Sequence, residues 1–90
     1  MPGPRFVADP PALTRRVEMD GLTALFHIPS GMTHLLAAPA PQILDVIAND
    51  PGDPAEILSR MAVAFDVEGG EEAILARLAE LEASGLVSRV

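Results

Sequence analysis

Residues 13–36, LTRRVEMDGLTALFHIPSGMTHLL, contain the pattern that decides the fold of this 90-residue chain. Leu13, Arg15, Val17 and Met19 alternate with polar residues, which predicts a half-buried strand. Asp20-Gly21 suits the positive φ angles of a two-residue hairpin turn, so the run from 22 to 28 predicts a second strand. A turn at 29–31 then leads into a third strand over 32–36. The stretch therefore predicts a three-stranded antiparallel meander.

From residue 39 onward the apolar residues take a helical period. The first predicted helix covers about 39–48 and ends before the breaker at 49–52. The second begins after Asp53, which forms a capping box with Glu56, and its apolar face runs to Phe65. The third covers about 71–84, and Gly85 is placed to end it in the left-handed conformation. The predicted class is α+β, with the order βββααα.

The two ends of the chain show no such pattern. Residues 1–12 hold four of the nine prolines and predict a flexible arm, which leaves residues 13–90 as a single domain. Residues 86–90 predict a short extended tail.

Charge and composition restrict the classes of partner. The net charge is -7, and the chain has no lysine. Residues 46–90 carry three arginines against nine acidic residues, which gives -6 for that half. An acidic surface repels phosphate backbones and anionic lipid, so neither nucleic acid nor a membrane is an expected partner. The absence of cysteine, of a signal-peptide pattern and of a long apolar run predicts a soluble cytoplasmic protein.

Catalytic and metal-binding patterns are lacking. The serines have no nucleophile-elbow context, and Gly69-Gly70 is not followed by the Lys and Ser/Thr of a phosphate loop. A turn symmetric about Pro29-Ser30-Gly31-Met32 would place His27 and His34 opposite each other, but two histidines without cysteine or a nearby acid make a poor metal site. We therefore expect a cross-strand histidine pair, no cofactor and no enzymatic activity.

Several of these segments together resemble the PqqD-like family of peptide chaperones, also called RiPP recognition elements, which have a winged-helix-like fold. The resemblance covers about residues 13–90 and rests on the following matches: Ser30-Gly31-Met32-Thr33-His34-Leu35-Leu36, Ala40, Ile43, Leu44, Glu56-Ile57-Leu58, Phe65, Leu78, Leu81 and Gly85-Leu86-Val87. The Thr33-His34-Leu35-Leu36 form resembles the HPr-rel-A system subgroup. One departure is Ala37, where many members have an Asn that caps the first helix, so here the cap must come from elsewhere, with help from Pro39.

The resemblance implies a non-catalytic module that binds the leader segment of a ribosomally made precursor peptide and presents it to a modifying enzyme. The leader would add as a strand to the third strand, in a groove beside the third helix. The implied peptide-binding residues are Thr33, His34, Leu35, Leu36, Leu75, Arg77, Leu78 and Glu82. The subgroup name further implies a partner related to HPr kinase.

The residues leave several alternatives open. Glu82 either reaches solvent near the helix end or meets a basic peptide residue in the groove, and Arg77 can pair with Glu80 at i+3. Arg60 follows Glu56 at i+4, as on a solvated helix face. A structural or adaptor subunit is the main alternative function. A winged-helix nucleic-acid binder is disfavoured by the one arginine and four acids of the third helix, and a homodimer through the exposed strand edge is a further option.

Overall fold

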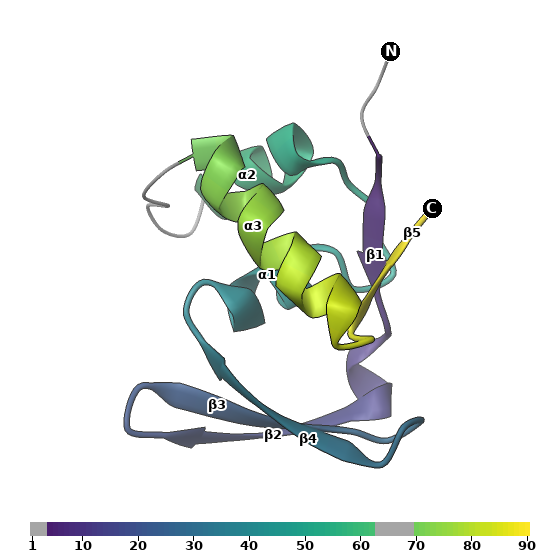
Figure 1. Ribbon diagram of the computed structural model, residues 1–90, viewed down its shortest axis with the longest axis vertical. Coiled ribbons are helices and arrows are strands. Elements are labelled where there is room, and N and C mark those ends of the chain that lie inside the picture. The colour runs from purple at the N-terminus through teal and green to yellow at the C-terminus, as the bar shows by residue number, and fades with distance from the viewer. Residues whose placement is uncertain (1–3, 63–69) are drawn as a thin grey trace.

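The computed structural model describes residues 4–62 and 70–90, and these form two layers with a second, two-stranded sheet at one end (Figure 1). The elements in chain order are β1 (Phe6–Ala8), a 3-10 turn η1 (Pro11–Leu13), β2 (Thr14–Met19), β3 (Leu22–His27), β4 (Met32–Ala37), α1 (Ala40–Val46), α2 (Pro54–Ala62), α3 (Gly70–Ala83) and β5 (Val87–Arg89). The predicted meander followed by three helices is confirmed. The predicted helical residue Phe65 lies outside the described residues.

The meander is an antiparallel sheet of order β2-β3-β4. Its first turn is the predicted two-residue one, with φ of 43° at Asp20 and 80° at Gly21. The second turn covers residues 28–31 and so begins one residue earlier than the predicted Pro29–Met32 turn, because His27 pairs with Met32. His34 therefore lies opposite Leu25, and the predicted directly opposed histidine pair is wrong. The two histidines are diagonal neighbours on the same face.

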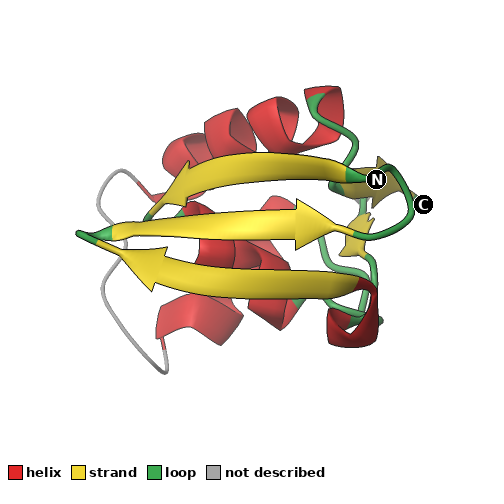
Figure 2. Cartoon of the chain, turned by 90° about the horizontal axis from the view of Figure 1, so that it is seen from below, coloured by secondary structure: helices red, strands yellow, loops and turns green. Residues whose placement is uncertain are grey.

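The alternation in β2 predicted that its apolar side faces the core, but the sheet buries the opposite face. Val17 and Met19 are exposed, whereas Thr23, Leu25 and His27 of β3 are buried. Helices α1, α2 and α3 lie behind the sheet in Figure 2. The register and the exposure of Val17 and Met19 place the apolar side of β2 on the opposite face. The prediction of a half-buried β2 is wrong, because the side facing the core carries Thr14, Arg16 and Glu18.

The N-terminal segment is part of the fold, which corrects the predicted flexible arm for the residues that the structure describes. β1 pairs antiparallel with β5, so the extended tail at 86–90 has its partner at the other end of the chain (Figure 1). Phe6 is 1% exposed, and its backbone also exchanges two hydrogen bonds with Gly52 (2.8 and 2.9 Å). The proline-rich composition did not reveal that two apolar residues of this segment, Phe6 and Ala8, belong to the core.

The helix ends follow the sequence closely. Asp53 and Glu56 form the predicted capping box, with Glu56 N–H donating to Asp53 Oδ1 (2.8 Å) and Asp53 N–H donating to Glu56 Oε1 (3.0 Å). α3 ends at Gly85, whose φ is 85°. Leu86 N–H donates to Leu81 C=O and Gly85 N–H donates to Glu82 C=O, which is the Schellman pattern. α1 has Pro39 at its N-cap position and no side-chain cap, so the cap that was expected from elsewhere in place of the Asn is not found.

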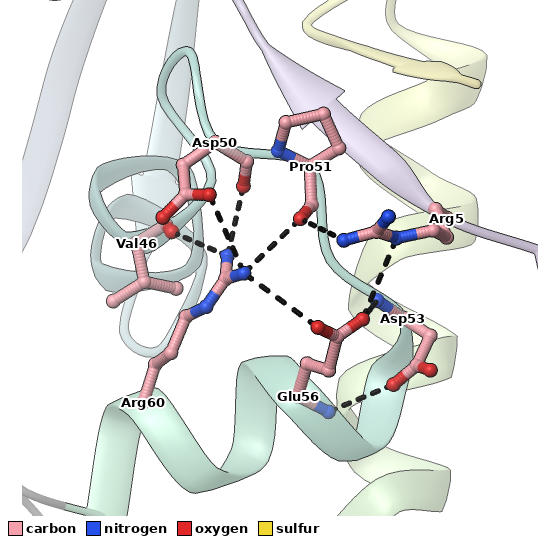
Figure 3. Close-up of polar contacts among 7 residues, drawn as sticks. All are labelled: Arg5, Val46, Asp50, Pro51, Asp53, Glu56 and Arg60. Carbon is pink, nitrogen blue, oxygen red and sulfur yellow. Dashed lines mark hydrogen bonds and ion pairs between the residues drawn. The ribbon is translucent and has the colours of Figure 1, made fainter.

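Arg60 has a structural role that its spacing from Glu56 did not indicate. Its guanidinium donates to the carbonyl oxygens of Val46 (2.9 Å), Asp50 (2.8 Å) and Pro51 (3.0 Å), as Figure 3 shows. Arg5 donates to the same Pro51 oxygen (2.9 Å), so the segment before β1, the 46–51 turn and α2 are joined through one cluster. The interpretation of Arg60 as a solvated-face residue is wrong, because three of its contacts satisfy backbone groups left unpaired after α1.

Candidate functional site

β4 is an edge strand, because its only strand neighbour in the described chain is β3. Hydrogen-bonded and non-hydrogen-bonded pairs alternate along antiparallel strands. Ile28 N–H donates to Leu13 C=O (2.9 Å), which directs the alternate β3 residues 23, 25 and 27 toward β4. Their β4 partners are thereby engaged, and the backbone N–H and C=O groups of Thr33, Leu35 and Ala37 point to the open edge. Three donors and three acceptors are available to another extended chain.

A groove of about 540 Å³ lies along this open edge. Residues of β4, the start of α1 and one side of α3 line it: Thr33, His34, Leu35, Leu36, Ala37, Ala38, Ala40, Arg77, Glu80, Leu81 and Ser84. Thr33 and Leu35 share the face of the sheet that points away from the helices, so the groove meets them chiefly at their backbone. His34 and Leu36 point toward the helices and contribute their side chains.

The groove combines an apolar base with polar groups along its length. Leu81 is buried and Leu36 packs against the core. His34 Nε2 is buried and has no hydrogen-bond partner in the described structure. Across from β4, Arg77 and Glu80 of α3 form the predicted i+3 ion pair (3.0 Å). A peptide in this groove would therefore meet backbone groups on one wall and a mixed-charge helix on the other.

The predicted site residues divide into two groups. Thr33, His34, Leu35, Leu36 and Arg77 line the groove together. The other three do not.

Leu75 is 47% exposed and does not line the groove. Leu78 is fully buried in the core, where it cannot contact a ligand. Glu82 accepts a hydrogen bond from Arg89 Nε (2.8 Å), and Arg89 lies 5.3 Å from the centroid of the Phe6 ring. Glu82 thus joins α3 to β5, and neither of the two roles considered for it describes this contact.

Of the α3 residues that line the groove, the sequence predicted Arg77 and missed Glu80, Leu81 and Ser84. Arg77, Glu80, Leu81 and Ser84 recur at the i, i+3, i+4, i+7 spacing of one helix face. The sequence contains this periodicity. The prediction followed Leu75 and Leu78 instead, and Leu78 lies on the neighbouring face of α3, which packs in the core. No comparable sequence signal exists for the alanines that line the groove, Ala37, Ala38 and Ala40. An alanine has no polar side-chain group, and its contribution is to leave room for a ligand.

His27 serves the fold and not the groove. Its Nε2 lies 2.7 Å from Asp9 Oδ2, and its Nδ1 lies 2.8 Å from Ser30 Oγ. The ring is 8% exposed and ties β3 to the segment that follows β1. The expected cross-strand histidine pair is replaced by these contacts to an acid and a hydroxyl.

A second, smaller cavity lies beneath the sheet, among Ala8, Thr14, Arg16, His27 and Leu44. Its volume of about 20 Å³ holds roughly one water molecule. Among residues 4–62 and 70–90, no group of three or more His, Cys, Asp or Glu residues is arranged to bind a metal ion. None of the helices described is long and apolar enough to span a bilayer.

Comparison with known proteins gives a structural match only. No family model matches the chain, and no curated protein matches it. A solved structure described as TbiB1 in complex with the TbiA(beta) leader peptide is similar, with a TM-score of 0.60 and 18% sequence identity. The alignment covers 89% of this chain and 94% of the TbiB1 chain. This chain therefore has the fold of a protein that was solved with a leader peptide bound.

Proposed function

We propose that this protein is a non-catalytic peptide chaperone that binds the leader segment of a ribosomally made precursor and presents it to a modifying enzyme. The observation that carries the proposal is the unpaired edge of β4, which opens into a groove of about 540 Å³. A leader that adds as a fourth antiparallel strand would pair with the backbone of Thr33, Leu35 and Ala37. The similarity to TbiB1, solved with its leader peptide, supports this function.

The side chains that line the groove suggest which types of leader residue would bind there. Main-chain hydrogen bonds supply affinity in strand addition, and alternate peptide side chains supply specificity. Alternate residues of the leader would enter the space between β4 and α3, against Leu36 and Leu81 at its base. The unpartnered His34 Nε2 favours a leader residue with a hydroxyl or amide group at the neighbouring position.

The surrounding charge agrees with a peptide and disagrees with a nucleic acid. α3 as a whole carries Arg77 against Glu71, Glu72, Glu80 and Glu82, in a chain of net charge -7. Phosphate backbones would be repelled. We further propose that the enzyme served by this protein, or a kinase-related partner, contacts the complex outside the groove.

The open backbone edge can be tested without disturbing the sheet. Thr33→Pro removes an outward N–H, and proline is tolerated at an edge strand when its missing donor faces solvent. With a fluorescent peptide from the short open reading frames beside the gene, we expect Thr33→Pro to weaken binding at least about tenfold. Thr33→Ala is the matched control, because it changes the side chain and keeps the donor.

Two results would contradict the proposal. One is that no neighbouring peptide binds the wild-type protein at high concentration, which would favour a structural or adaptor subunit. The other is that Thr33→Pro retains its fold by circular dichroism and binds the peptide as tightly as Thr33→Ala.

A further inference from the structure

One face of the β2-β3-β4 sheet is mostly apolar and is not covered by other elements of the described chain. We call it the outer sheet face, and it consists of Arg15, Val17 and Met19 of β2, Leu22, Ala24 and Phe26 of β3, and Thr33, Leu35 and Ala37 of β4. In Figure 2 it faces the viewer, with the helices behind it. Leu35 is 64% exposed and Val17 is 61% exposed, on the central row of the face. Contiguous exposed apolar surface of this kind marks an interaction site.

The sheet region has no net charge, whereas the rest of the protein is acidic. Residues 13–37 carry two arginines and two acidic residues, so this region is neutral in a chain of net charge -7. Arg16 pairs with Asp45 (2.9 Å), and Glu18 accepts a hydrogen bond from Thr23 (3.1 Å). Arg15 and Asp20 have no charged partner within 4.0 Å in the part of the chain that the structure describes.

These two uncommitted charges lie at opposite ends of β2. Arg15 is near its beginning, and Asp20 is in the turn that follows its last residue. A second copy placed face to face, with the two-fold axis between the sheets and perpendicular to the strands, reverses β2 over β2. Arg15 of each copy then lies over Asp20 of the other, and the apolar rows meet between them. The alternative axis, parallel to the strands, would place β2 over β4 and leave both Arg15 and Asp20 without an opposite charge across the contact.

We propose that the outer sheet face binds a second copy of this chain and forms a two-fold symmetric dimer. Two sheets pack about 10 Å apart in such an arrangement, with strand directions within about 30° of each other. The acidic excess of residues 46–90 belongs to the helical half of each copy and stays away from the contact. The dimer leaves the edge of β4 and the groove free, so this inference does not depend on the proposed function.

The area of the proposed dimer contact is small, and this limits the expected affinity of the dimer. Three strands about 4.8 Å apart and six residues long, at about 3.3 Å each, give a projected area of roughly 300 Å². Stable complexes bury about 800 Å² per partner. We therefore expect a reversible dimer that forms only at concentrations of about 10 µM to 1 mM.

The first test is sedimentation velocity over that concentration range. The wild-type protein should shift from monomer to dimer, and Leu35→Glu should remain a monomer because it would bury a carboxylate against an apolar face. Leu75→Glu is the matched control, since Leu75 is a 47% exposed leucine on α3, and it should dimerise as the wild type does. A wild-type protein that stays monomeric to about 1 mM would overturn the proposal. Dimerisation of Leu35→Glu equal to that of the wild type would also overturn it, and would indicate pairing through the β4 edge.

Reversing the charge at position 15 or at position 20 tests the two-fold symmetry of the proposed dimer. Arg15→Asp and Asp20→Lys each place like charges at both ends of the dimer and should each abolish it at low salt. Mixed in equal amounts, the two variants restore both opposite-charge pairs and should form a heterodimer. Circular dichroism of each variant verifies that it is folded. A mixture that stays monomeric, while both variants are folded and the wild type dimerises, would overturn the proposed arrangement.

Discussion

The six arginines of this chain have different structural roles, and burial separates them more clearly than charge does. Arg60 has a side chain that is 26% exposed, and its guanidinium donates to three backbone carbonyl groups. Arg77 is 43% exposed and pairs with one carboxylate on its own helix. Sequence spacing placed both in i+3 or i+4 pairs with glutamates. It could not show that the turn at 46–51 comes back within reach of Arg60, because that contact depends on tertiary structure.

Replacing Arg60 should therefore cost much more stability than replacing Arg77. We expect Arg60→Ala to lower the free energy of unfolding by about 2–4 kcal/mol, because the carbonyl groups of Val46 and Asp50 lose the guanidinium donor and that of Pro51 keeps only Arg5. Arg77→Ala removes an exposed ion pair and should cost at most about 1 kcal/mol. Urea unfolding followed by far-ultraviolet circular dichroism measures both. Equal losses in the two variants would contradict the role assigned to Arg60.

The two histidines form a second matched pair at the residue scale. His27 bonds Asp9 and Ser30, whereas His34 Nε2 has no partner in the described structure. We expect His27→Ala to lower the free energy of unfolding by about 1–3 kcal/mol and His34→Ala to change it by less than about 1 kcal/mol. The same unfolding measurement decides this. A larger stability loss for His34→Ala than for His27→Ala would contradict the division between a structural and a groove histidine.

At the scale of elements, the pairing of β1 with β5 closes the fold. Phe6 and Phe26 allow a direct comparison, since Phe6 is 1% exposed and Phe26 is 39% exposed. We expect Phe6→Ala to lower the free energy of unfolding by about 3–5 kcal/mol, because it leaves a cavity beneath β1. Phe26→Ala should cost about 1 kcal/mol or less at concentrations where the protein is monomeric. A Phe6→Ala variant as stable as Phe26→Ala would restore the view of residues 1–12 as a flexible arm.

Local signals predicted most of the elements, and long-range contacts account for the errors. The Asp20-Gly21 turn, the capping box and the Gly85 helix stop depend on residues within a few positions of each other, and all three are confirmed. The β1–β5 pairing joins the two ends of the chain, which no periodicity reports. The buried face of β2 was assigned incorrectly because its apolar residues belong to the outer sheet face. The alternation was real, but it cannot state which side meets the core.

At the scale of the whole molecule, the sheet has two surfaces with separate potential uses. Its β4 edge opens into the groove beside α3, and its outer face is mostly apolar and is not covered by other elements of the described chain. The resemblance to peptide chaperones placed five of the eight predicted site residues in the groove. Leu75, Leu78 and Glu82 were misplaced because one helix has several faces, and only the packing of α3 against α1 and α2 selects the face toward β4.

Backbone amide NMR can test residue by residue whether a leader peptide adds as a strand to β4. The labelled protein would be titrated with the short peptides encoded beside its gene. We predict shift changes concentrated on residues 33–38 and on residues 77–84 of α3, with slower hydrogen exchange at the amides of Thr33, Leu35 and Ala37. Shift changes confined to the outer sheet face around Val17 and Phe26, or the absence of any change with every peptide, would contradict strand addition at β4.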